Sequence, residues 1–119
     1  MDPTSEWMDL TMETKDIGEP SKWVPMKDPR LLAAIGKLGE EVNELGAIIF
    51  RCIIQGINEK DPETGKHNLV ALAEEIADVR ALSAIVIKET HLDWVTILER
   101  AERKSKMKNK WLDQLGPKP

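Results

Sequence analysis

Two stretches decide the fold: PRLLAAIGKLGEEVNEL at residues 29–45 and LAEEIADV at residues 72–79. In both, apolar residues return every three or four positions, the spacing of one face of an α-helix. The first helix is expected to begin at Asp28-Pro29, a cap residue followed by proline, and to end near Gln55-Gly56. The apolar stripe expected on it comprises Leu31, Ile35, Leu38, Val42, Leu45, Ile49 and Cys52.

The second stretch predicts a helix from about Asn68, taken as its cap, to about Thr90. Its expected stripe is Leu69, Leu72, Ile76, Val79, Ser83 and Val86. Asp93 can cap a last helix that continues from Trp94 to about Leu112. No strand pattern of period two is present, so we expect an all-α fold, arranged as four helices. Residues 1–27 are predicted to form an acidic arm with a short helix near 5–14, and residues 28–115 the domain itself.

The composition fits one small domain in a reducing compartment. The chain has 119 residues, a net charge of −4 and a single cysteine, Cys52, which reads as a core residue. No apolar run approaches the roughly 20 residues of a membrane span, and the acidic start does not resemble a signal peptide. We therefore expect a cytoplasmic protein with no membrane partner. A domain of this size buries a limited share of its surface, so dimerisation would help to complete its core.

Three glycines interrupt the first helix, and basic residues gather at the end of the chain. Gly36, Gly39 and Gly46 each cost about 1 kcal/mol against alanine, and we expect them to allow close helix approach or ligand access. Residues 99–119 carry seven Lys/Arg against three Asp/Glu. This basic segment is either a solvated helix face or a phosphate-binding element. Nucleic acid is an unlikely partner, since the chain as a whole is acidic and no stacking aromatics alternate with the lysines.

Paired carboxylates form the strongest chemical pattern. Glu41 and Glu44, and likewise Glu75 and Asp78, are three residues apart, which on a helix brings their Cβ atoms to roughly 5–6 Å. The chain contains six acidic pairs at this spacing, but these two lie beside apolar stripes on consecutive helices. Facing each other, the four carboxylates would repel unless cations neutralised them. An all-oxygen ligand set suits Mg²⁺ or Mn²⁺ rather than zinc. The alternative is that all four lie on solvated helix flanks.

The motifs EExxE at 40–44 and EExxD at 74–78 resemble those of the MazG-type all-α nucleoside triphosphate pyrophosphatases, which include dimeric dUTPases and dCTP pyrophosphatases. The similarity runs from about Trp23 to Trp111. It implies a four-helix bundle-like MazG fold that assembles as a dimer or a dimer of dimers. The implied reaction is Mg²⁺-dependent hydrolysis of a nucleoside triphosphate to a monophosphate and pyrophosphate, with Mn²⁺ as a possible substitute. The implied metal ligands are Glu41, Glu44, Glu75 and Asp78.

The resemblance also implies roles for residues outside this quartet. Glu40 would orient or deprotonate the attacking water, whereas Glu74 is expected to stay on the surface. Family members often bind phosphates through lysine and asparagine near the end of the last helix. The corresponding candidates are Lys106, Asn109 and Lys110, although the spacing around Asn109 departs from the family pattern. Trp23 falls near a region that often contributes to the base pocket, yet a packing role for it is also expected.

Two other functions compete with nucleotide-pool hydrolysis. The same resemblance includes phosphoribosyl-ATP pyrophosphohydrolases, so that activity is the alternative within the enzyme class. The other is a non-catalytic helical module that uses its stripes for oligomerisation. A di-iron carboxylate bundle is disfavoured because neither histidine follows a glutamate at the Glu-x-x-His spacing.

Overall fold

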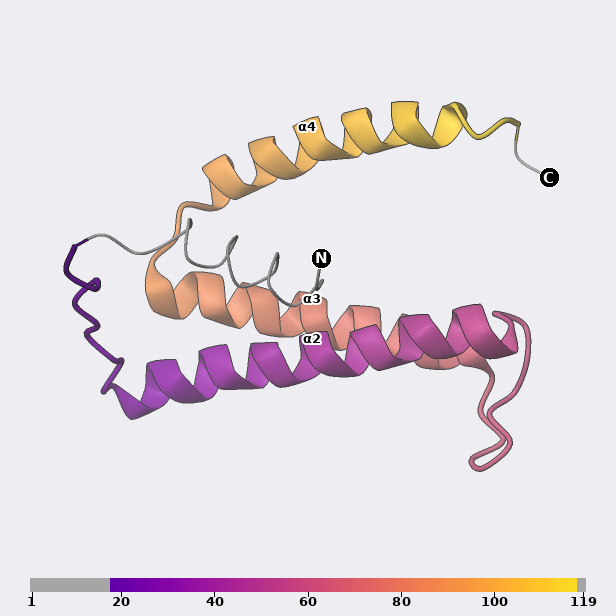
Figure 1. Ribbon diagram of the computed structural model, residues 1–119, viewed down its shortest axis with the longest axis horizontal. Helices are drawn as coiled ribbons and strands as arrows, with labels where there is room; N and C mark the ends of the chain where they lie inside the picture. The colour runs from indigo at the N-terminus through magenta and orange to yellow at the C-terminus, as the bar shows by residue number, and fades with distance from the viewer. Residues whose placement is uncertain (1–17, 118–119) are drawn as a thin grey trace, which may run out of the picture.

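The computed structural model describes residues 18–117, which form three α-helices and no extended strand (Figure 1). The helices are α2 (Pro29–Gln55), α3 (Asn68–Thr90) and α4 (Trp94–Asp113). The all-α class is confirmed, and the predicted helix ends agree with the structure to within about one residue. The short helix expected near 5–14 lies outside the described residues, so the four-helix arrangement stays a prediction.

The helix ends follow from local capping chemistry. The Asp28 carboxylate accepts a hydrogen bond from the backbone N–H of Arg30 at 3.0 Å, and the Asp93 carboxylate accepts one from Val95 at 3.1 Å. Each bond satisfies an amide that the helix itself leaves without a partner. His91, with φ of 57° in the left-handed region, ends α3 and donates its backbone N–H to a carbonyl of the last turn.

The helices α2 and α3 lie side by side and antiparallel, as Figure 1 shows. On α2, the face that meets α3 is centred on Glu41, which is 7% exposed. The expected apolar stripe does not coincide with this buried face, because two of its members, Val42 and Ile49, are 48% and 42% exposed in the single chain. Each residue turns a helix by about 100°, so burying Glu41 rotates Val42 toward the flank. On α3, Ile76 is likewise half exposed.

A buried asparagine joins the two helices at their connected ends. His67 takes the N-cap position of α3, so the prediction that Asn68 caps this helix is wrong. Asn68 is instead fully buried, and its side-chain amide donates to the Gly56 carbonyl at 2.9 Å and to the Gln55 side chain at 3.2 Å. These bonds satisfy the C-terminal end of α2 from the first residue of α3.

The connecting turn between these helices is itself ordered. An antiparallel bridge pairs Lys60 with His67. Between them, the buried carboxylate of Asp61 accepts a hydrogen bond from the Thr64 hydroxyl at 2.9 Å and lies 3.6 Å from Arg51 of α2. The bond from Thr64 is the main cause of a lowered pKa for Asp61. The turn is thereby fastened to the end of α2.

The single chain closes no apolar core over its described residues. There, Ala71 and Ile87 are the two hydrophobic residues that are buried. The radius of gyration is 20.8 Å, whereas a compact chain of this length has about 13–14 Å. In Figure 1, α4 runs apart from the α2–α3 pair. Trp94 and Trp111 on α4 are 47% and 56% exposed, so they do not serve as core residues of the single chain.

Within the described part of the chain, no helix combines the length and the apolar character needed to cross a bilayer.

Candidate metal centre

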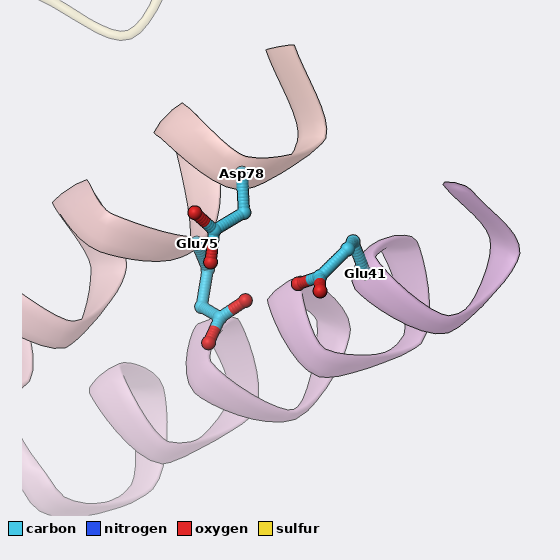
Figure 2. Close-up of side chains that lie close together, drawn as sticks. All are labelled: Glu41, Glu75 and Asp78. Atoms are coloured by element: carbon cyan, nitrogen blue, oxygen red, sulfur yellow. The ribbon is translucent and has the colours of Figure 1, made fainter. Parts of the chain in front are cut away.

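Three of the four predicted ligands converge between α2 and α3. Glu41 extends from α2, and Glu75 and Asp78 extend from one turn of α3 toward it (Figure 2). One carboxylate oxygen from each residue lies within 4.8 Å of those of the other two. The i, i+3 spacing brings Glu75 and Asp78 together on α3, and the antiparallel packing brings Glu41 opposite them.

The burial of Glu41 is the most unusual feature of this cluster. The residue is 7% exposed, and its Oε2 atom is buried with no hydrogen-bond partner in the described structure. The Oε2 atom of Glu75 is in the same state. A buried carboxylate oxygen with no donor loses its hydration without compensation, so such atoms call for a proton or a cation nearby. Two of them in one cluster make that need stronger.

Glu44, the fourth predicted ligand, interacts electrostatically with Glu41 and Glu75. It does not belong to the group of three converging oxygens. The pKa of Glu44 is nonetheless raised, first by hydrogen bonding to the Glu41 carboxyl and then by the negative charge of Glu41. The pKa of Glu75 is also raised, first by burial and then by the charges of Glu44, Glu41 and Asp78. Glu44 and Glu75 therefore retain their protons more readily than separate carboxylates would.

Lys37, which the sequence analysis did not single out, lies at the rim of the acidic cluster. The Nζ atom of Lys37 is 3.1 Å from Glu40 Oε1 and 3.5 Å from Glu41 Oε1. Its side chain is 51% exposed, so solvent screens these pairs. Lys37 stands four residues before Glu41, a spacing that places the two on the same helix face. That spacing was visible in the sequence, but such pairs are common on solvated helices.

The first glutamates of the two motifs, Glu40 and Glu74, lie outside the cluster. Glu40 is about half exposed and paired with Lys37. Its proposed role toward a water molecule stays a prediction. Glu74 is also about half exposed, and it forms an ion pair with Lys66 at 2.7 Å. The expectation that Glu74 is a surface residue is confirmed.

The predicted phosphate and base contacts lie on exposed segments. Lys106, Asn109 and Lys110 are exposed on α4, and Lys106 pairs with Glu102 at 3.3 Å. Trp23 lies in the segment that leads to α2 and is 87% exposed. The single chain does not bring α4 against the α2–α3 pair, so the substrate-binding roles of these four residues stay predictions.

The donor set of the cluster matches a hard divalent cation. Every candidate ligand atom is a carboxylate oxygen, which is what Mg²⁺, Mn²⁺ and Ca²⁺ prefer. Because no thiolate or imidazole belongs to the cluster, the soft or borderline metals are less well suited to it. A hard cation held by these three oxygens would keep further coordination positions for water or a phosphate oxygen.

Comparison with known proteins leaves the family open, since no family model, no curated protein and no solved structure matches this chain.

Proposed function

We propose that this chain is a Mg²⁺-dependent nucleoside triphosphate pyrophosphohydrolase. The observation that carries the proposal is the buried Oε2 atom of Glu41, which has no hydrogen-bond partner and sits in a cluster with Glu75 and Asp78. A bound divalent cation would neutralise this cluster and supply the missing partner. The resemblance of the two acidic motifs to the MazG-type enzymes supplies the reaction class.

In this proposal Glu41, Glu75 and Asp78 hold the cation, and Glu44 joins them from the next turn of α2. When bound, Mg²⁺ supplies positive charge that binds phosphate oxygens and stabilises the leaving group. Glu40 accepts a proton from the attacking water as the water oxygen bonds to the α-phosphorus. The bond from the α-phosphorus to the oxygen of the β-phosphate breaks, which releases a nucleoside monophosphate and pyrophosphate.

Assembly is part of the same proposal. We infer a homodimer or a homotetramer, because the described part of one chain buries two hydrophobic residues and leaves α4 without a packing surface. In an assembly, Lys106, Asn109 and Lys110 would reach phosphate groups of the substrate. Phosphoribosyl-ATP remains the alternative substrate within this reaction class.

The decisive experiment compares substitutions of two adjacent glutamates on α3, Glu75 and Glu74. Pyrophosphate release is measured for a panel of nucleoside triphosphates and phosphoribosyl-ATP, with Mg²⁺, with Mn²⁺ and with EDTA. We expect Glu75→Gln to reduce kcat/KM more than about 100-fold, since even outer partners of metal ligands cost 10–100-fold. The matched control Glu74→Gln removes the same charge one residue away, from a side chain on the surface, and should change kcat/KM less than about threefold.

Two results would overturn the proposal. One is full activity in Glu75→Gln, which would show that the acidic cluster does not hold the catalytic cation. The other is the absence of pyrophosphate release from every substrate with either metal, accompanied by no binding of Mn²⁺ to the wild-type chain.

A further inference from the structure

A second apolar stripe follows α2 beside the face that meets α3. Its members, which we call the outer seam, recur every three or four residues, with Ile49 and Phe50 sharing one step: Leu32, Ile35, Gly39, Val42, Gly46, Ile49, Phe50 and Ile53. Five of them are between 42% and 72% exposed, namely Leu32, Val42, Ile49, Phe50 and Ile53. An apolar stripe of this length on a helix is ordinarily covered by another helix.

None of the charged residues of α2 lies on the outer seam. At about 100° per residue, all six charged residues of the helix fall on the remaining part of its circumference. They are Arg30, Lys37, Glu40, Glu41, Glu44 and Arg51. The seam is therefore free of charge from Leu32 to Ile53, and it lies on a different side of α2 from Lys37 and Glu44. A solvated helix face would not be expected to lack charge over six turns.

Two glycines occupy the middle of the seam. Gly39 and Gly46 are seven residues apart, so they lie two turns apart on the same side of α2. A Cβ atom built on either would meet nothing within 4 Å. Each glycine costs about 1 kcal/mol against alanine inside a helix. Close approach of a second backbone explains this cost, and the chain's own described residues provide no such neighbour.

Six of the eight outer-seam residues form pairs about the midpoint of the seam, whereas Val42 and Ile49 have no such partner within it. A two-fold axis between Val42 and Asn43 would place Gly39 opposite Gly46 of a second copy. The same axis would place Leu32 opposite Ile53, and Ile35 opposite Phe50. This self-complementarity is what an isologous two-fold interface requires, where residue i meets j and j meets i. Neither α4 nor an unrelated protein would need it.

The exposed area is large enough for a stable interface. The chain has 10665 Å² of accessible surface, whereas a compact monomer of its mass has about 6,500 Å². Part of the difference belongs to the extended segment before α2, which is exposed throughout its described residues. Permanent dimers bury roughly 2,000–5,000 Å² in total, which is comparable to the excess of accessible surface that this chain carries.

We propose that a second copy of this chain packs antiparallel on the outer seam of α2, with the glycines of the two copies at the crossing point. The proposal gives the interface of the assembly inferred above, and it does not rest on the proposed enzymatic activity, since the acidic cluster lies on another side of α2. The glycines allow the two helix axes to come closer than larger side chains would permit. Val42 lies beside the two-fold axis, close to Val42 and Asn43 of the second copy.

The first test is the mass of the full-length chain in solution, measured by light scattering over a range of concentrations. The wild type should have at least twice the mass of a single 13.4 kDa chain. Val42→Lys places two like charges near the axis and should weaken dimerisation about 100-fold or more. The control Ile54→Lys introduces the same charge at a neighbouring apolar residue that is 81% exposed and lies outside the seam, and it should leave the mass unchanged.

Disulfide cross-linking tests the register in a Cys52→Ala background, so that no native thiol interferes. Chains with Leu32→Cys, mixed with chains with Ile53→Cys, should form a cross-linked pair under mild oxidation, and neither chain alone should do so efficiently. Efficient Leu32→Cys self-linking would overturn the antiparallel arrangement. A wild-type chain that stays monomeric at every concentration would rule out a second copy as the partner of the outer seam. Glu41→Gln should remain dimeric, so a failed enzyme assay and a failed dimer are separate results.

Discussion

Lys37 lies beside only one of the two carboxylate oxygens of Glu41, and the other oxygen lies in the buried cluster. The Lys37 ammonium lies 3.5 Å from Oε1 of Glu41, while Oε2 of the same group is buried without a partner. One oxygen of Glu41 thus interacts with a cation at the rim, and the other is left for the interior. Oε2 of Glu41 is thereby left for the proposed cation, while Lys37 offsets part of the negative charge around this carboxylate.

Replacing Lys37 with methionine should strengthen Mg²⁺ binding. The substitution keeps most of the aliphatic side chain but removes a positive charge near the proposed cation. Coulomb repulsion between an ammonium and a divalent ion at about 6 Å in a water-like dielectric corresponds to roughly tenfold in affinity. Isothermal titration with Mg²⁺ at low ionic strength measures this change, and added salt should reduce it.

The control for this prediction is Lys106→Met. Lys106 makes a similar i, i+4 ion pair with Glu102, but on α4 and with both side chains well exposed. Its loss should leave Mg²⁺ affinity unchanged. If Lys37→Met binds Mg²⁺ more weakly than the wild type, Lys37 orients Glu41 more than it repels the cation, and the electrostatic account is wrong.

Stability without metal should fall as the pH rises above about 4.5. The raised pKa values of Glu44 and Glu75 mean that the folded chain holds protons that the unfolded chain, with an ordinary pKa of 4.5, has already released. Where the folded state binds more protons, the free energy of unfolding decreases with pH. Thermal melting in EDTA between pH 4.5 and 7 measures this slope, and saturating Mg²⁺ should make it shallower.

Carboxyl groups with lowered pKa values have the opposite effect on the pH dependence of stability, and this effect appears at lower pH. Asp61, Glu89 and Asp93 have their pKa lowered, mainly by side-chain hydrogen bonds from Thr64, Arg30 and Thr96. Their stabilisation is lost as the pH falls through those lowered values, below the window set by Glu44 and Glu75. A melting temperature in EDTA that keeps rising from pH 4.5 to 7 would contradict the raised pKa values.

The helix ends were predictable because they depend on neighbouring residues. Asp28-Pro29 and Asp93 each start a helix through a side-chain bond formed two residues away, which any sequence reading can anticipate. The convergence of Glu41 with Glu75 and Asp78 was also predictable, since it needs helical spacing and antiparallel packing of consecutive helices.

The side that each helix buries was harder to predict. α2 carries two apolar stripes about a quarter turn apart, one on the face that meets α3 and the other the outer seam. Apolar residues recur every three or four positions in both stripes. The sequence analysis combined members of the two, which is why the expected stripe includes Val42 and Ile49. Asn68 was misread for a similar reason, because asparagine at a helix start is usually a cap, whereas here it bonds to the end of the preceding helix.

Glu75→Gln should stabilise the metal-free fold. The substitution removes a charge that burial and three neighbouring carboxylates disfavour, so we expect the melting temperature in EDTA to rise by about 5 °C. The same variant should lose most of the rise in melting temperature that Mg²⁺ produces in the wild type. Glu74→Gln, on the surface, should change neither quantity. A lower melting temperature for Glu75→Gln in EDTA would show that this carboxylate is already compensated.

Asn68→Ala should destabilise the chain at the junction of α2 and α3. The side chain is fully buried and donates to the Gly56 carbonyl and the Gln55 side chain, so its loss leaves the part-buried Gly56 carbonyl without this donor. Such a loss costs about 1–3 kcal/mol, measured by urea unfolding at one fixed protein concentration. Asn58→Ala, at an exposed position of the adjoining turn, is the matched control and should cost less than about 0.5 kcal/mol. Equal effects of the two substitutions would mean that the bonds from Asn68 do not hold the helix ends together.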